Sequence, residues 1–199
     1  MLVAFLFSVL SVNGALFDLV NDDLAGRFGA LDDFMKLCAK YAIYAIVVLV
    51  AGSWFVRAGR GEHRRIAVYS AVAAAALALI AALVIQHFYV HQRPFVQRSD
   101  VDLLMSHSAD ASFPSEHATA AFAMAAGAGI YRARLGIVLL VLAVLVAFSR
   151  VYVGIHYPAD VAGGAALGII AAIAVWAARP ALDYIDRLVV ARIVPEFLR

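Results

Sequence analysis

The sequence predicts an all-α integral membrane protein, a helical bundle with five or six transmembrane helices. Of its 199 residues, 65% are hydrophobic and only 15% are charged, and the mean hydropathy is +0.89. A soluble domain of this size has too little interior to bury that much apolar surface. The apolar residues also gather in long runs, and a helix of roughly 20 apolar residues crosses a bilayer. The composition therefore excludes a soluble fold.

Five apolar runs supply the predicted spans. In chain order they cover residues 41–56, 66–90, 113–130, 135–148 and 158–178. The fourth run is short, and we expect residues 149–154 to extend it into an interface lined by protein. An earlier run, residues 2–20, contains Asn13 and Asp18, so it is either a sixth span or an interfacial segment. It has no basic residue ahead of its apolar stretch, which argues against a signal peptide.

The chain has the pattern of one membrane-embedded domain over residues 1–199, because it contains no repeat, low-complexity tract or linker. We place the catalytic core at residues 30–178. Apolar and charged residues alternate in residues 179–199, which predicts an amphipathic cytoplasmic tail helix. Gly164 and Gly168 predict a close contact between helices and do not by themselves require a dimer. The single cysteine, Cys38, rules out an intramolecular disulfide.

Arginines predict the orientation of the spans. They cluster between the first two runs, between the third and fourth, and after the fifth. These residues are Arg57, Arg60, Arg64, Arg65, Arg132, Arg134, Arg179, Arg187, Arg192 and Arg199. The positive-inside rule puts these regions in the cytoplasm, so residues 92–112, residues 150–157 and the acidic stretch 18–33 face outward. Basic residues that flank spans, without a clustered stripe, also exclude nucleic acid as a partner.

The outward segment after the fourth run carries a histidine and a carboxylate at a useful spacing. Pro158 suits the first turn of a helix, because its missing N–H would have no partner there. His156 precedes that helix, and Asp160 lies four residues further on. A turn here brings the carboxylate to one ring nitrogen and leaves the other exposed for attack. Asp160 also stabilises the positive charge that grows on the ring as a phosphohistidine forms.

The third run opens with a second cluster, Pro114, Ser115, Glu116 and His117. We expect Pro114 to begin the helix, so that the backbone N–H groups of the next three residues point out of its N-terminus and cradle a phosphate. The Ser115 hydroxyl adds a hydrogen bond. His117, one turn in, is placed to protonate a leaving oxygen and later to activate water.

Two arginines complete the set. Arg93 precedes the third run and Arg150 follows the fourth. A guanidinium grips phosphate oxygens through a planar fork, which a lysine cannot imitate. Phosphoryl transfer spreads negative charge over equatorial oxygens, so two arginines stabilise its transition state. These residues predict phosphoryl transfer at the outward-facing surface of the membrane.

In their spacing, these residues resemble the three-part signature of the type-2 phosphatidic acid phosphatase family. The matching words are Arg93-Pro94, Pro114-Ser115-x-His117 and Ser149-Arg150-x5-His156-x3-Asp160. The resemblance implies a helical membrane bundle and a hydrolysis that needs neither a metal nor another cofactor. It implies His156 as the covalent nucleophile, Asp160 as its orienting residue and His117 as the general acid. The expected phosphate-binding residues are Arg93, Ser115, Arg150, Glu116 and Gln86.

Longer stretches around the motifs are similar to the bacterial undecaprenyl-pyrophosphate phosphatases linked to bacitracin resistance. That resemblance implies hydrolysis of a polyprenyl diphosphate to the monophosphate, which recycles the cell-wall lipid carrier at the periplasmic face of the inner membrane. Three alternatives stay open. They are a phosphatase of phosphatidate, phosphatidylglycerol phosphate or another lipid phosphate, a lipid phosphotransferase, and a transporter or headgroup-binding protein without catalysis.

The chain departs from the wider family at two positions. The family begins its first motif with a lysine seven residues before the arginine, where this chain has Gln86, so one phosphate-facing cation is missing. Either Gln86 donates a neutral hydrogen bond or His91 partly replaces the cation. The family usually has glycine in place of Glu116, which we expect to make a secondary contact or to tune the local charge.

For other polar residues near the motifs we expect no catalytic role. His87 and His91 have the spacing of a helical metal pair but lack a third ligand, so no metal site is expected. We expect His107 to lie in a solvated outer loop with its neighbouring aspartates. Among those, Asp110 is placed to line the entrance of the site.

Overall fold

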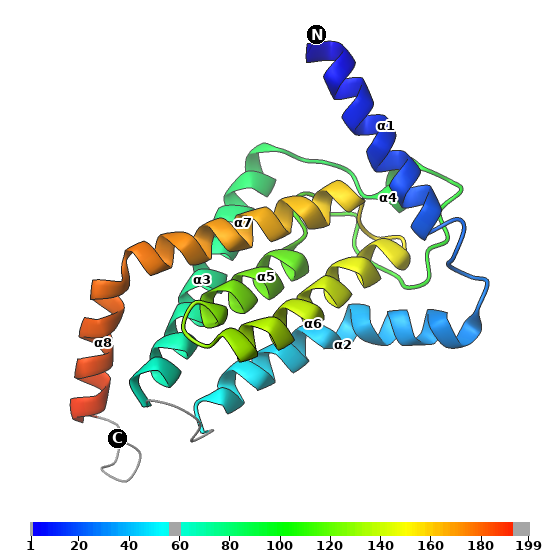
Figure 1. The fold of residues 1–199 in the computed structure, drawn as a ribbon. Helices are drawn as coiled ribbons and strands as arrows, with labels where there is room; N and C mark the ends of the chain where they lie inside the picture. Colours follow the sequence, from blue (N-terminus) through cyan, green and yellow to red (C-terminus); the bar gives the residue numbers. More distant parts are fainter. Residues whose placement is uncertain (1, 56–60, 193–199) are drawn as a thin grey trace.

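The computed structural model describes residues 2–55 and 61–192, and every regular element in those ranges is a helix (Figure 1). This confirms the all-α prediction. The helices are α1 (Leu2–Val20), α2 (Gly29–Ser53), α3 (Gly61–Phe88), α4 (Pro94–Gln97), α5 (Glu116–Gly129), α6 (Ala133–Tyr152), α7 (Pro158–Ala177) and α8 (Arg179–Arg192).

Four of these helices, α2, α3, α6 and α7, are long and apolar enough to cross a bilayer. Helix α5 has 14 residues, about 21 Å at 1.5 Å per residue, and is shorter than the hydrocarbon core. It lies in the middle of the bundle, against α3, α6 and α7. A central helix surrounded by four spanning helices needs no full-length contact with lipid, which explains how a short helix fits the third predicted span.

Helix α2 begins at Gly29, twelve residues before the predicted run at 41. In its first turns Met35, Cys38 and Ala39 are buried, while Asp33 is exposed and pairs at 3.1 Å with the half-buried Lys36. The buried residues recur every three or four positions, so one face packs on the bundle, while the other carries these charges beside the exposed Phe34 and Leu37. The apolar run marks only the part of the helix that is apolar on all sides.

Small residues let α7 approach α5 closely. A Cβ atom at Gly164 would lie 2.7 Å from the Ser115 carbonyl oxygen, and one at Gly168 would lie 2.6 Å from the Thr119 carbonyl oxygen. Neither distance is compatible with a side chain. The predicted small-residue contact is therefore an internal contact of the bundle, and it fixes the start of α5 beside the start of α7.

Helix α1 projects from the bundle in Figure 1. Its C-terminal half touches the bundle, where the Asn13 side chain accepts a hydrogen bond from the Ala159 N–H at 2.9 Å and Phe17 packs on Tyr157. The side chains of α1 are described for residues 11–20, and this part of the helix is apolar but shorter than a span.

The two ends of the bundle differ in charge. The α2–α3 and α5–α6 connections and helix α8 lie at one end, together with Arg64, Arg65, Arg132, Arg134, Arg179 and Arg187 (Figure 1). Arg57, Arg60 and Arg199 lie outside the described residues, and the side chain of Arg192 does as well. Arg65 donates two hydrogen bonds, of 2.6 and 2.9 Å, to the Asp186 carboxylate, which fastens the tail helix to α3. The connections that carry the catalytic motifs lie at the opposite end.

Candidate active site

The motif residues meet in a polar pocket of about 100 Å³ at the end of the bundle opposite the arginine clusters. Its lining consists of Gln86, Arg93, His107, Asp110, Ala111, Glu116, His117, Arg150 and His156. Six of the eight residues predicted for the site are in this lining. The other two, Ser115 and Asp160, are fully buried and support the wall.

The connection between α6 and α7 carries His156 into the pocket. Gly154 has φ +81°, and a Cβ atom there would lie 2.8 Å from Val101, so glycine is required for the turn that follows α6. Pro158 is the first residue of α7, as predicted. The Asp160 carboxylate accepts a hydrogen bond from the Tyr157 N–H at 2.8 Å, which caps the helix. The ring of His156 is held, almost wholly buried, between two fixed helix ends.

The neighbours of His156 determine its tautomer. Nε2 lies 3.0 Å from Nη1 of Arg93, and a guanidinium can only donate, so Nε2 carries the lone pair. Nδ1 lies 3.3 Å from the Ser112 hydroxyl oxygen. That hydroxyl donates its own hydrogen to Asp160 at 2.5 Å, so it accepts from Nδ1–H. The lone pair of Nε2 therefore points at the Arg93 guanidinium, which lines the pocket together with His156.

Burial is the main cause that lowers the pKa of His156, to about 4, and the positive charges of Arg93 and Arg150 act in the same direction. The contact with Asp160 opposes them without reversing the shift. A histidine with this pKa is unprotonated at neutral pH. It can therefore act as a nucleophile without first losing a proton.

The Asp160 carboxylate contacts more side chains than its motif predicts. Its Oδ2 is 3.5 Å from Nδ1 of His156, too long for a good direct hydrogen bond, so Ser112 bridges the two residues. Its Oδ1 lies 3.3 Å from Nδ1 of His91, a contact that raises the pKa of His91. The structure thus places His91 behind the pocket, against Asp160. It does not line the pocket and cannot replace the missing cation there.

Arg93 is buried and fully engaged. Its guanidinium contacts the Asp110 carboxylate at 2.7 and 2.8 Å and donates to the carbonyl oxygens of Ile155 and Ala111 at 3.0 and 3.3 Å. Asp110 lines the entrance, as expected. Burial by itself would raise the pKa of Asp110, but hydrogen bonds from Ser108 and Arg93 outweigh it and the pKa is lowered. Asp110 is therefore an ionised partner of Arg93.

Arg150 is held differently. Nη1 donates to the Ala39 carbonyl oxygen of α2 at 3.2 Å, and Nη2 lies 3.1 Å from Nε2 of His107. Its Nε has no hydrogen-bond partner within the described residues. Among the described residues no carboxylate contacts this buried charge, which suits Arg150 to an anionic ligand.

The start of α5 differs from its prediction. The helix begins at Glu116 with Ser115 as its N-cap, so Pro114 lies outside it. The Ser115 N–H donates to the Asp160 carbonyl oxygen at 3.0 Å, because α5 and α7 approach so closely, and it is not free to bind phosphate. The Ser115 hydroxyl is buried without a hydrogen-bond partner in the described part of the chain. His117 lines the pocket one residue into the helix.

Gln86 and Glu116, the two departures from the family pattern, both reach the pocket. Gln86 donates from Nε2 to the Pro114 carbonyl oxygen at 3.1 Å. Glu116 is exposed and, with His117, also lines a second hollow of about 190 Å³ whose other walls are Ile43, Leu79 and Ala120. This hollow lies between α2 and α3. It shares Glu116 and His117 with the polar pocket, and we call it the side opening of that pocket.

Two residues at the site were not predicted. His107, expected in a solvated loop, is half-buried in the pocket against Arg150, so that expectation was wrong. Ser112 bridges His156 and Asp160. Both lie on the irregular connection between α4 and α5, where no helical period marks which residues point inward. Their only signal in the sequence is proximity to the motif that begins at Pro114.

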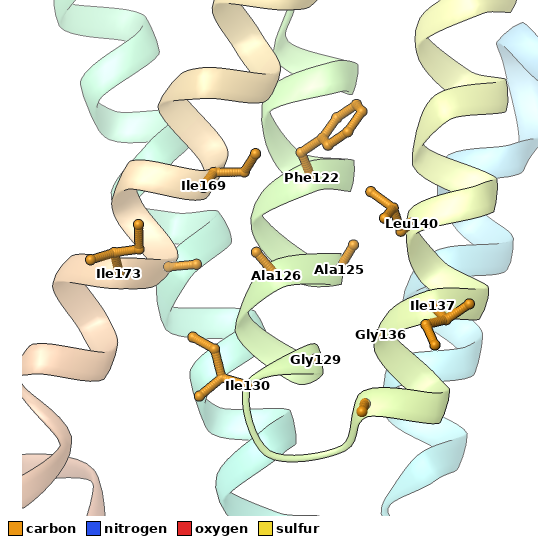
Figure 2. Close-up of a pocket in the computed structure, with 12 residues that line it drawn as sticks. Phe122, Ala125, Ala126, Gly129, Ile130, Gly136, Ile137, Leu140, Ile169 and Ile173 are labelled. Atoms are coloured by element: carbon orange, nitrogen blue, oxygen red, sulfur yellow. The ribbon is translucent and has the colours of Figure 1, made fainter.

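A larger hollow is unrelated to this chemistry. It measures about 510 Å³ and lies on the opposite face of α5. Figure 2 shows α5 as its floor, with Phe122 and Gly129 facing it, and with α6 and α7 as its walls. Exposed residues such as Ile137 and Ile173 line it, and none of the lining residues is titratable. It is part of the lipid-facing surface.

Comparisons with known proteins bear on the family of this chain. The PAP2 superfamily profile matches residues 67–184. The chain is similar to the bacitracin transport permease protein BcrC of Bacillus licheniformis, with 31% identity over 96% of this chain and 94% of that one. It is 34% identical to undecaprenyl-diphosphatase BcrC of Bacillus subtilis over 74% of each chain. The crystal structure of Aquifex aeolicus LpxE superposes with a TM-score of 0.65 and 28% identity, covering 81% of this chain and 93% of that one.

Proposed function

Because the chain belongs to the PAP2 superfamily and is a multi-pass membrane lipid phosphatase, we propose that it hydrolyses a polyprenyl diphosphate, undecaprenyl diphosphate, to the monophosphate. The observation that carries the proposal is the lone pair on Nε2 of His156, which accepts from Arg93 in a pocket that also holds a second arginine and a second histidine. That arrangement has a nucleophile, fixed positive charge and a proton donor within one phosphate-sized space.

The first chemical step is attack by Nε2 of His156 on the terminal phosphorus. The bond between that phosphorus and the bridging oxygen breaks, and His117 gives its proton to the departing lipid monophosphate. The phosphorylated ring gains positive charge, which the Asp160 carboxylate stabilises through Ser112. Arg93 leaves Nε2 as the phosphate enters, and its guanidinium then binds the transferred oxygens.

The second step returns the enzyme to its starting state. Water attacks the phosphorus of the phosphohistidine, His117 takes the proton from the water, and the bond to Nε2 breaks to release inorganic phosphate. Arg93 and Arg150 bind the phosphate throughout, and the unpartnered Ser115 hydroxyl adds a hydrogen bond. The neutralising charges in this scheme come from arginines, so the reaction proceeds without a metal ion. Gln86 and Glu116 contact the substrate at the rim.

The side opening supports a lipid substrate with a long apolar chain. Ile43 and Leu79 line it, and Glu116 and His117 are shared with the phosphate pocket. A headgroup bound in the pocket can therefore keep its chain in the bilayer between α2 and α3. The 34% identity to an undecaprenyl-diphosphatase favours a polyprenyl chain over a glycerolipid.

Charge supports an outward-facing site in the bacterial inner membrane. The arginines Arg64, Arg132 and Arg134 mark the end of the bundle away from the pocket as cytoplasmic. At the pocket end the cations are largely paired with aspartates: Arg98, for example, contacts Asp18 and Asp100. The active site then lies on the periplasmic side, where a carrier released by cell-wall synthesis is recycled.

The test is release of inorganic phosphate by the purified protein in detergent with EDTA. Undecaprenyl diphosphate is compared with phosphatidate and phosphatidylglycerol phosphate, and His156→Ala is compared with His63→Ala, a histidine exposed at the far end of α3. We expect EDTA-resistant release that prefers the diphosphate, is abolished in His156→Ala and is unchanged in His63→Ala. Preference for a glycerolipid would refute the substrate, and turnover by His156→Ala would refute the mechanism.

A transport function is the second candidate, because the relative from Bacillus licheniformis is named a transport permease. Transport predicts movement of a ligand across proteoliposomes without phosphate release and without dependence on His156. Transfer of the phosphoryl group to a lipid acceptor would instead show as release that rises when acceptor lipid is added. The same purified protein distinguishes these outcomes.

A further inference from the structure

His107 has no part in the scheme above, yet it occupies the phosphate pocket. Its Nε2 lies 3.1 Å from Nη2 of Arg150, and its Nδ1 lies 3.2 Å from the Ser108 carbonyl oxygen. The guanidinium can only donate and the carbonyl can only accept, so the ring is neutral, with its hydrogen on Nδ1. The imidazole therefore covers the edge of Arg150 that a phosphate oxygen would bind.

Apart from the proton that His117 gives to the leaving oxygen, the charges of the pocket lining cancel in this state. Arg93 and Arg150 are opposed by Asp110 and Glu116, and Arg93 is already paired with Asp110 at 2.7 Å. Gln86, which stands where the family has a lysine, contributes no charge. A diphosphate brings one more ionised phosphate into the site than a monophosphate does. Its recognition therefore calls for a further cation, and among the lining residues only the two histidines besides His156 can become one.

Of those two histidines, His117 already carries the proton that passes to the leaving oxygen. His107 is therefore the residue that can supply the further cation. Its position also fits. Arg150 donates to the Ala39 carbonyl oxygen at 3.2 Å, and Ile43, one helical turn further along α2, lines the side opening. Arg150 and His107 thus lie on the side from which the lipid chain enters. With the terminal phosphate at His156, the second phosphate lies towards that side.

We propose that His107 is a specificity residue for lipid diphosphates. When substrate binds, its ring takes up a proton, leaves Arg150, and donates from Nε2 to an oxygen of the second phosphate. Arg150 is then free to bind the same anion. His107 thereby supplies the cation that Gln86 lacks. This inference rests on the proposed phosphatase function and names the headgroup that the site selects.

The electrostatics of the site agree with such an exchange. Burial, and then the charges of Arg93 and Arg150, lower the pKa of His107 in the empty pocket, while the Ser108 carbonyl and Asp110 oppose the shift only in part. The ring is therefore neutral before binding. A bound diphosphate places negative charge beside the ring, which favours the protonated form.

The test uses two ligands that differ by one phosphate: it measures kcat/KM for farnesyl diphosphate and the inhibition constant of farnesyl phosphate, the monophosphate product. We expect His107→Gln to lower kcat/KM for the diphosphate about tenfold or more, the effect of losing a hydrogen bond between charged groups, and to leave the inhibition constant of the monophosphate within about threefold. His87→Gln, a change at an exposed α3 histidine outside the pocket lining, leaves both values unchanged. Inhibition by the monophosphate also shows that the variant is folded.

Two results overturn the proposal. One is unchanged diphosphate hydrolysis by His107→Gln. The other is an equal loss of diphosphate hydrolysis and of monophosphate inhibition in His107→Gln and His107→Asn, which would mean that His107 only positions Arg150. If the wild-type protein does not hydrolyse the diphosphate, the proposed function itself fails, so the two failures are distinguishable.

Discussion

Replacement of Asp160 by asparagine tests how the nucleophile is held. The Asp160 carboxylate is fully buried and receives the Tyr157 N–H at 2.8 Å and the Ser112 hydroxyl at 2.5 Å, while His91 lies 3.3 Å from its other oxygen. Asparagine keeps one acceptor oxygen, loses the negative charge and presents a donor in place of the second oxygen. The cap of α7 survives in part, whereas stabilisation of a positive His156 ring does not.

The expected magnitude follows from these contacts. A hydrogen bond to a charged group contributes about 1.5–3 kcal/mol, and burial removes the screening by water that would weaken it. Since about 1.4 kcal/mol corresponds to a factor of ten in rate, we expect Asp160→Asn to lower kcat by about 10–150-fold. KM changes little, because Asp160 does not line the pocket. The helix cap accounts for a loss of stability of about 1 kcal/mol or less.

The assay combines steady-state phosphate release with a thermal melt of the same preparation in detergent. A fall in kcat with nearly constant KM and a small change in melting temperature supports the assigned position. If kcat stays within about threefold of wild type while the melting temperature drops, Asp160 is only a helix cap and the reasoning is refuted.

Three further predictions concern the same architecture. Ser112→Ala removes the bridge between His156 and Asp160 and should lower kcat about tenfold at constant KM; an unchanged kcat would show that the direct 3.5 Å contact suffices. The pKa of His156 is about 4, and the protonated ring cannot attack. Protonation of His156 should therefore lower kcat/KM as the pH drops through about 4. A pH profile whose single acid limb lies near the ordinary histidine pKa would contradict this. Gly168→Ala places a Cβ atom 2.6 Å from the Thr119 carbonyl oxygen and should destabilise the bundle by about 1–3 kcal/mol in thermal melts, whereas Gly52→Ala, with open space around it, should not; equal melting temperatures would refute the close α5–α7 contact.

Local patterns in the sequence predicted most of the bundle. Apolar runs located the spans, because a segment in lipid must satisfy its backbone within a helix whatever its neighbours are. The same patterns misjudged α2, which begins at Gly29 because one face of its first turns is covered by the bundle. The short helix α4 was not predicted at all. Both cases depend on which surfaces are covered, and a hydropathy run does not record that.

For the site, the spacing of the motifs was sufficient to select Arg93, His117, Arg150 and His156, since each stands at the end of a helix or beside a proline that fixes the local backbone. The spacing did not predict which side chains contact these residues. His91 was considered for the pocket and lies behind it, and His107 was expected in solvent and lies against Arg150.

By itself, then, the sequence determined the membrane class, the approximate position of the long helices and the set of residues with phosphoryl-transfer chemistry, because these depend on composition and on short-range spacing. Only the tertiary structure decided which loop side chains complete the site. Ser112 meets His156 across 44 residues of chain, and His107 meets Arg150 across 43. Such contacts follow from how closely α5 packs between α6 and α7, and the irregular loop backbone between α4 and α5 has no period from which they can be read.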